Sequence, residues 1–113
     1  MAYDEVLTQR FRDALGDTEG ISEKRMMGGV CFLVNGNMIG GADRSKVGQG
    51  RFMFRVGKEN VDTAAALPGG QQMIQGGRKM SGFFFVDEEN CSDDVMRSWL
   101  DLAFQHANAL QPK

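Results

Sequence analysis

The dipeptide Asn35-Gly36 constrains this sequence more than any other feature, because it predicts a tight hairpin. Asparagine followed by glycine accepts the positive φ angles that both central residues of a type I′ turn require. Apolar residues flank the dipeptide on both sides, at 30–34 and at 38–39. We therefore predict two antiparallel strands, residues 30–34 and 38–42, joined by a two-residue turn.

A two-residue turn also fixes which side chains face one another across the hairpin. The predicted register places Leu33 opposite Met38 and Phe32 opposite Ile39. Both faces of the strand at 30–34 are apolar, which is typical of an inner strand.

The rest of the chain shows alternating helical and extended patterns. Apolar residues recur at helical spacing over residues 3–15 and again after Ser92, which is a good N-cap for a helix that runs to about residue 110. A weaker helical pattern covers residues 58–67. Further strands are predicted at residues 21–26, 51–56 and 80–86, whereas residues 71–79 are predicted to be irregular or partly extended.

This order of elements predicts an α+β fold, a two-layer sandwich in which helices flank a mainly antiparallel, five-stranded sheet. No strand–helix–strand unit repeats, so a parallel sheet is not expected. The chain of 113 residues suits one domain, residues 1–113, with one core. We expect Phe32, Phe54, Trp99 and Leu102 to be buried together.

The sequence offers no recognisable catalytic, metal or cofactor site. The only histidine, His106, lies on the apolar stripe of the last predicted helix, and neither Cys31 nor Cys91 has a local signature that pairs it with His106. Gly57-Lys58 lacks the other residues of a P-loop, and the glycine doublets are better explained by bends and close packing. We expect no enzyme activity, no cofactor and no metal, and two free thiols in a reducing cytoplasm.

Positive charge is concentrated between residues 24 and 58, with acidic stretches on either side. The candidate interaction surface consists of basic residues on predicted strands or beside them: Lys24, Arg25, Arg51, Arg55, Arg78 and Lys79. If the strands lie side by side, these bases gather on the open face of the sheet. The alternative is a solvated surface whose charges offset one another after folding.

Such a basic face suits an acidic protein partner. Nucleic acid is the weaker candidate, because the sequence pI of about 5.3 argues against strong independent binding and the interleaved Phe52 and Phe54 are expected to face the core. A homodimer is possible. No apolar run is long enough to span a bilayer, so no membrane partner is expected.

Several segments together resemble the amino-terminal domain of the TfoX/Sxy family. They are Lys24-Arg25-Met26-Met27-Gly28-Gly29 followed by Phe32 and Asn35-Gly36-Asn37-Met38, the later Gly77-Arg78-Lys79-Met80 with Gly82-Phe83, and the opening Met1-Ala2-Tyr3-Asp4-Glu5. Met27 stands where phenylalanine is usual. The resemblance implies an antiparallel sheet with flanking helices, similar to type III secretion chaperones. It implies a bacterial protein related to regulators of competence for DNA uptake, with no enzyme activity, cofactor or metal. The longer regulators carry a second, carboxy-terminal domain, and this chain stops at Lys113.

Two functional hypotheses remain open from the sequence. In the first, the protein is a non-enzymatic interaction module in transcription regulation that acts through protein contacts. In the second, it is a small ligand-binding protein or enzyme with a cleft beside the sheet. The first predicts no deep polar pocket, whereas the second requires polar groups that converge on a cavity.

Overall fold

The computed structural model describes residues 4–26, 28–45 and 47–112, which contain one antiparallel sheet and three α-helices. The strand order is β1-β2-β3-β4-β6-β5, and every neighbouring pair is antiparallel. The strands are β1 Ile21–Met26, β2 Gly29–Val34, β3 Asn37–Arg44, β4 Gly50–Arg55, β5 Gly70–Gln75 and β6 Arg78–Asp87. The helices are α1 Glu5–Leu15, α2 Val61–Ala65 and α3 Asp93–Asn108, with short 3-10 turns η1 Lys58–Asn60 and η2 Glu88–Asn90.

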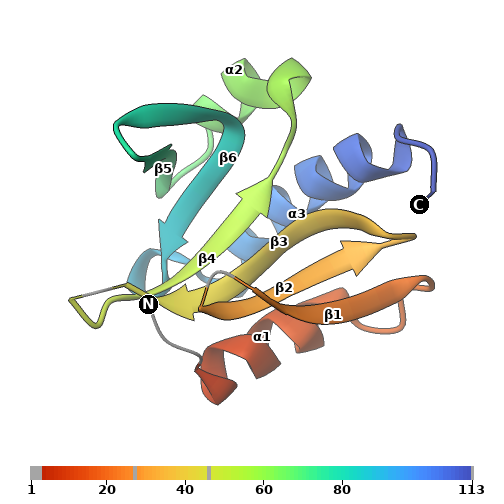
Figure 1. The fold of residues 1–113 in the computed structure, drawn as a ribbon, viewed down its shortest axis with the longest axis horizontal. Coiled ribbons are helices and arrows are strands. Elements are labelled where there is room, and N and C mark those ends of the chain that lie inside the picture. The colour runs from red at the N-terminus through yellow and green to blue at the C-terminus, as the bar shows by residue number, and fades with distance from the viewer. Residues whose placement is uncertain (1–3, 27, 46, 113) are drawn as a thin grey trace.

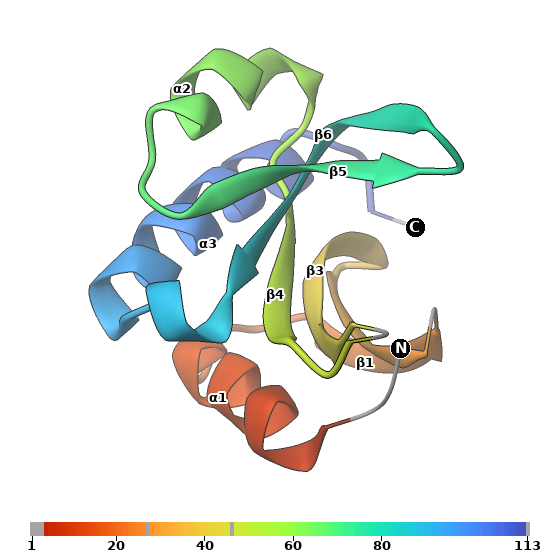
Figure 2. The ribbon, with the colours of Figure 1, turned by 90° about the vertical axis from the view of Figure 1, so that its left-hand side faces the viewer.

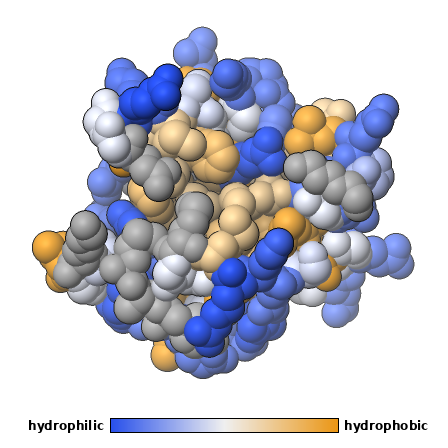
Figure 3. Space-filling model, in the orientation of Figure 1, coloured by the Kyte–Doolittle hydropathy of each residue, from blue (hydrophilic) through white to orange (hydrophobic). Residues whose placement is uncertain are grey.

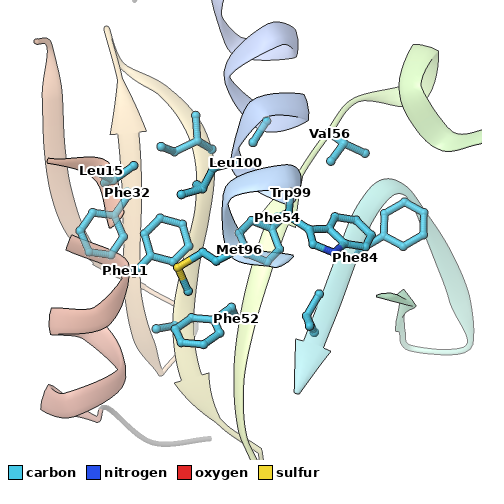
Figure 4. Close-up of a cluster of buried hydrophobic side chains, with 14 of the residues drawn as sticks. Phe11, Leu15, Phe32, Phe52, Phe54, Val56, Phe84, Met96, Trp99 and Leu100 are labelled. Carbon is cyan, nitrogen blue, oxygen red and sulfur yellow. The ribbon is translucent and has the colours of Figure 1, made fainter. Parts of the chain in front are cut away.

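The molecule has two layers, because α1 and α3 both pack on one face of the sheet (Figures 1 and 2). The core between these layers is aromatic (Figure 4). Phe11 of α1 stacks on Phe32 with ring centroids 4.6 Å apart, and Trp99 of α3 lies 5.7 Å from Phe54. The indole N–H of Trp99 donates a hydrogen bond of 3.2 Å to the Pro68 carbonyl. In the part of the chain that the structure describes, no helix lies on the opposite face of the sheet, which we call the open face.

The predicted α+β class is confirmed, but the sheet has six strands and the predicted count of five is wrong. The additional strand is β5, which falls in the segment predicted to be irregular or partly extended. Gly76 and Gly77 both have positive φ, at 60° and 78°, and form a tight turn that lets β5 fold back on β6. The turn residues were visible in the sequence, but the polar composition of β5 concealed a strand.

The hairpin at Asn35-Gly36 is confirmed, with φ angles of 51° and 84°. Leu33 pairs with Met38 as predicted. The predicted pairing of Phe32 with Ile39 is wrong, because an irregularity between Phe32 and Leu33 shifts the register and Phe32 pairs with Gly40.

The helix ends follow their capping residues. The Asp4 carboxylate accepts a hydrogen bond of 2.9 Å from the backbone N–H of Leu7 at the start of α1, and Ser92 caps α3 in the same way through Val95. The predicted helix over residues 58–67 is shorter than expected, because its first residues form the 3-10 turn η1. Tyr3, which was assigned to the first helix, lies outside the described residues.

Most of the predicted core is confirmed. Phe32, Phe54 and Trp99 are fully buried, whereas Leu102 is only partly buried at the margin of the core. Met96 and Leu100 occupy the buried face of α3 instead. Cys31 and Cys91 are both free thiols, as predicted, and both are buried.

No helix in the described part of the chain is long and apolar enough to cross a membrane.

Candidate interaction surface on the open face of the sheet

A second apolar cluster lies on the open face, apart from the aromatic core. Its buried centre consists of Cys31 of β2, Met53 of β4 and Met73 of β5. Partly buried side chains surround this centre: Met26, Met38, Met80, Phe83 and Phe85. Successive residues of a strand point to opposite faces, which explains how Phe52 and Phe54 enter the core while Met53 between them belongs to this cluster.

A groove of about 420 Å³ runs over the cluster. It is lined by Met26, Gly28, Gly29, Val30, Cys31, Gly41, Ala42, Asp43, Arg51, Met53, Met73, Ile74 and Phe85. Figure 3 shows apolar side chains gathered at the centre of this face, with hydrophilic residues around them. Both edge strands line the groove, through Met26 of β1 and through Met73 and Ile74 of β5. The sheet is therefore curled, and its two edges project on the side away from α1 and α3 (Figure 2).

The doublet Gly40-Gly41 in β3 shapes both faces of the sheet at this point. Gly41 pairs with Cys31 on one side and Met53 on the other, so the missing side chain leaves the floor of the groove hollow. A Cβ atom at Gly41 would lie 2.5 Å from the Val30 carbonyl oxygen. Gly40 faces the helices, where its Cβ atom would lie 3.0 Å from the ring of Phe11. Gly40 therefore allows α1 to pack closely on the sheet, and Gly41 leaves space in the floor of the groove.

One ion pair lies at the groove wall, between Arg51 and Asp43. The Arg51 Nε donates a hydrogen bond of 2.8 Å to one Asp43 oxygen, and Nη2 lies 3.3 Å from the other. The guanidinium also stacks on the Phe85 ring, with Cζ 3.8 Å from the ring centroid. Arg51 is therefore held in place on both sides, and its positive charge is largely offset by Asp43.

The other predicted surface residues divide between the two faces. Lys24 pairs with Cys31 and so lies on the open face, as does Arg55, whose guanidinium lies 5.9 Å from the Phe83 ring centroid. Arg78 and Lys79 lie at the start of β6, beyond the irregularity in its pairing with β5, and both are exposed.

Arg25 follows Lys24 by one position, so it points the other way. Arg25 pairs with Val30, whose side chain enters the core. Lys79 pairs with Ile74, which lines the groove. The structure therefore brings Lys24, Arg51 and Arg55 to one face, turns Arg25 away from it and places Arg78 and Lys79 in the β5–β6 hairpin.

Both cysteine thiols have a raised pKa. Burial raises the pKa of the Cys31 thiol, and the negative charge of Asp43 raises it further. Burial likewise raises the pKa of Cys91, which lies in the core, to about 11. A thiol with a raised pKa is a poor nucleophile, because the thiolate is the reactive form.

His106 lies away from the groove. Its Nδ1 is 2.6 Å from the Glu59 carboxylate, and this hydrogen bond lowers the pKa of Glu59. The pair connects α3 to η1. Among the described residues, no three or more His, Cys, Asp or Glu side chains are placed to hold a metal ion.

The sequence predicted that six bases gather on the open face, and Arg25 departs from that prediction; the methionine-rich cluster between the bases was not predicted. Its members come from different strands, so no single window of sequence displays it. A usable signal was present in β4 and β6, where Met53, Phe83 and Phe85 occupy positions of the same parity as Arg51 and Arg55. Large apolar residues on the side of a strand that faces away from the core indicate an interaction surface or a ligand-binding groove.

A family model described as the TfoX N-terminal domain matches residues 13–107. That range includes all six strands and every residue that lines the groove. Neither the curated proteins nor the solved structures gave a match.

Proposed function

The chain belongs to the TfoX N-terminal domain family, and from this premise we propose that it is a non-enzymatic interaction module that acts in transcription regulation. It acts by binding another protein through the open face of its sheet. The family membership supports a role among regulators, and the groove supports the mode of action.

The observation that carries this proposal is the apolar cluster of Cys31, Met53 and Met73 with its partly exposed border. Methionine is flexible and polarisable, so a methionine-lined surface adapts to the side chains of a partner. A contiguous apolar patch with a polar border is characteristic of protein-binding sites.

The charges beside the cluster favour an acidic partner. Within the described residues, Lys24, Arg55 and Arg78 form no ion pair, and Lys24 and Arg78 are exposed. The guanidinium of Arg55 lies near the Phe83 ring, and its charge helps to lower the pKa of Glu59. These bases attract an acidic surface, and the attraction weakens as salt screens it. Arg25, which points to the other side of β1, remains outside this contact in the proposal.

Capture of partners from a bacterial lysate, by wild-type protein and by two charge-reversal variants, tests this proposal. The first variant combines Lys24→Glu with Arg55→Glu on the open face. Its matched control combines Lys58→Glu with Arg97→Glu, two exposed bases outside the sheet. Arg51 is left intact, because a glutamate there would meet Asp43 and disturb folding.

We expect the open-face variant to lose captured proteins that the control variant retains, and we expect the loss to be mimicked by high salt. Samples treated with nuclease report whether nucleic acid takes part. If both folded variants capture the same proteins as wild type, the open face is not the binding surface and the proposal is wrong.

The groove also favours a second candidate, a small apolar ligand. A volume of about 420 Å³ lies within the usual range of ligand pockets. The polar groups at the groove are few, however, and its one ion pair, Asp43 with Arg51, is already satisfied within the chain. The geometry therefore favours a protein partner over a small molecule or a substrate.

A further inference from the structure

We infer that the partner contributes an extended, acidic segment that pairs with the free edge of β5 and places its apolar side chains in the groove. This inference rests on the proposed function, because it names the kind of segment that the same surface binds. It is carried by the juxtaposition of an uncharged edge strand with the methionine-lined groove.

β5 is an edge strand with one unused side. Within the described residues it pairs with β6 alone and has no strand on its outer edge. The outward N–H and C=O groups of an edge strand form hydrogen bonds readily with an extended segment of another chain.

The two edges of the sheet differ in chemistry. β1 carries Glu23, Lys24 and Arg25 in succession, and charged side chains discourage an edge strand from accepting a further strand. β5 reads Gly-Gln-Gln-Met-Ile-Gln, with no charged residue and no proline. The side chain of Gln72 folds back on the sheet, where its amide N–H donates a hydrogen bond of 2.8 Å to the Met80 carbonyl. β5 is thus the edge with no charged barrier to strand addition.

β5 is also continuous with the groove. Met73 and Ile74 both line it, and Met73 is 6% exposed whereas Ile74 is 62% exposed. A strand added to β5 would lie about 4.8 Å beyond it, and alternate side chains would face the open side of the sheet. Because the sheet is curled and β1 lines the opposite wall, these side chains would enter the groove rather than solvent.

The bases on the open face select the charge of the segment. Arg78 and Lys79 lie in the β5–β6 hairpin next to this edge, Arg55 lies on the central strand β4, and Lys24 lies on β1 across the groove. Acidic residues in the added segment would satisfy them. A second copy of this chain would bring the same bases to the same surface, and like-charge repulsion disfavours that occupant.

Fluorescence anisotropy with labelled peptides of about ten residues tests the inference, because this length covers the six residues of β5 and extends beyond both of its ends. In the probe, every second residue is alternately valine or glutamate and serines fill the positions between them, so that both the apolar and the acidic side chains point to the open side. A matched peptide replaces glutamate with lysine. Two further peptides keep the acidic sequence but carry N-methyl groups on one or the other alternate set of residues, which removes the hydrogen-bond donors along one edge.

We expect the acidic peptide to bind, the lysine peptide not to bind, and one of the N-methylated peptides to bind at least about tenfold more weakly. Hydrogen exchange of the β5 amides should slow when the acidic peptide is present.

Two protein variants separate the edge of β5 from general charge effects. Ile74→Glu places an acid beside the groove, and Val6→Glu makes the same change at a 72% exposed residue of α1. We expect Ile74→Glu to weaken binding of the acidic peptide at least about tenfold and Val6→Glu to leave it unchanged. Thermal unfolding of both variants confirms that they are folded.

Three results would overturn the inference. If both N-methylated peptides bind as tightly as the parent, the open face binds the segment without strand addition, and the proposed function stands. If no peptide binds at about 1 mM while the lysate partners are still captured, the partner uses another conformation. If sedimentation shows a dimer that Ile74→Glu dissociates, the occupant of the edge is a second copy.

Discussion

Asp4 shows how one carboxylate serves two structural roles at the start of α1. One oxygen caps the helix through the Leu7 N–H, and the other lies 2.6 Å from Arg44 Nε. The hydrogen bond from Leu7 and, after it, the guanidinium of Arg44 lower the pKa of Asp4 below its usual 3.8. The first turn of α1 and the end of β3 are thereby connected through a single side chain.

The first prediction concerns this carboxylate. Asp4→Ala should lower the free energy of unfolding by about 1 kcal/mol, as the loss of an N-cap does. Asp4→Asn keeps a cap and removes the charge, so it should cost less. Since the folded pKa of Asp4 is lowered, its charge stabilises the protein above the unfolded pKa and this contribution is lost as pH falls through the folded value. The stability difference between wild type and Asp4→Asn, measured by urea titration, should therefore shrink from about pH 5 to about pH 2. A difference that grows on acidification would contradict the assigned pKa direction.

The second prediction concerns Gly41 at the groove floor. Gly41→Ala should destabilise the protein by about 1–3 kcal/mol, because the added methyl group meets backbone rather than a side chain that can move away. Gly41→Ala should also narrow the groove. It should therefore weaken binding of the acidic peptide by more than the loss of protein stability explains. Chemical denaturation and anisotropy on the same sample measure both effects. An unchanged denaturation midpoint would show that the backbone of β3 can shift to accommodate the methyl group.

At the scale of elements, the sequence predicted best where local chemistry decides the structure. Asn35-Gly36 and Ser92 act within a few residues of themselves, and both predictions are confirmed. β5 was missed because its assignment depends on a partner strand and not on its own polar residues. The face of α3 was partly misjudged for a related reason: Leu100 and Leu102 lie about 200° apart round the helix, and packing against the sheet buries Leu100 while Leu102 stays at the margin of the core.

The sequence was enough to predict basic residues at the candidate site, but it was not enough to predict the groove. Strand periodicity was enough to place Arg51 and Arg55 on one face. The groove requires the curl of the sheet, which brings Met26 and Met73 from its two edges into one surface. Curvature depends on the twist of the whole sheet and on Gly41, so no local pattern contains it.

The third prediction is at the scale of α3, which holds the sheet through Trp99. Trp99→Ala should lower the free energy of unfolding by about 3–5 kcal/mol, because the indole is fully buried between Phe54 and Phe84. Ser98→Ala, one residue away on a more exposed side of the helix, serves as the control and should change stability by less than about 0.5 kcal/mol. A melting temperature for Trp99→Ala close to that of wild type would show that the indole contributes little to the core.

At the scale of the whole molecule, the sheet separates two apolar regions, one on each of its faces. The aromatic core between the sheet and the helices holds the fold together, and the methionine cluster on the open face remains partly exposed. The two thiols report on these regions, because Cys91 belongs to the core and Cys31 to the open face.

The fourth prediction uses this separation. In the folded protein at about pH 8, both thiols should react slowly with a thiol reagent, since burial protects them and raises their pKa values. In denaturant without reductant, both should react completely. A bound partner should slow the reaction of Cys31 in a Cys91→Ser variant and leave Cys91 unaffected in a Cys31→Ser variant. Failure to titrate any thiol in the unfolded, unreduced protein would contradict the free state of both cysteines.

The position of Trp99 has a spectroscopic consequence. It is the only tryptophan of the chain, and its ring stacks on Phe54 of β4 and packs against Phe84 of β6. The residues beside those two phenylalanines, Met53 and Phe85, form the other side of the same strands at the groove. A partner that shifts either strand would move the aromatic neighbours of the indole and change its emission. The protein thus carries an intrinsic fluorophore behind its proposed binding surface, and tryptophan fluorescence can report binding there without an added label.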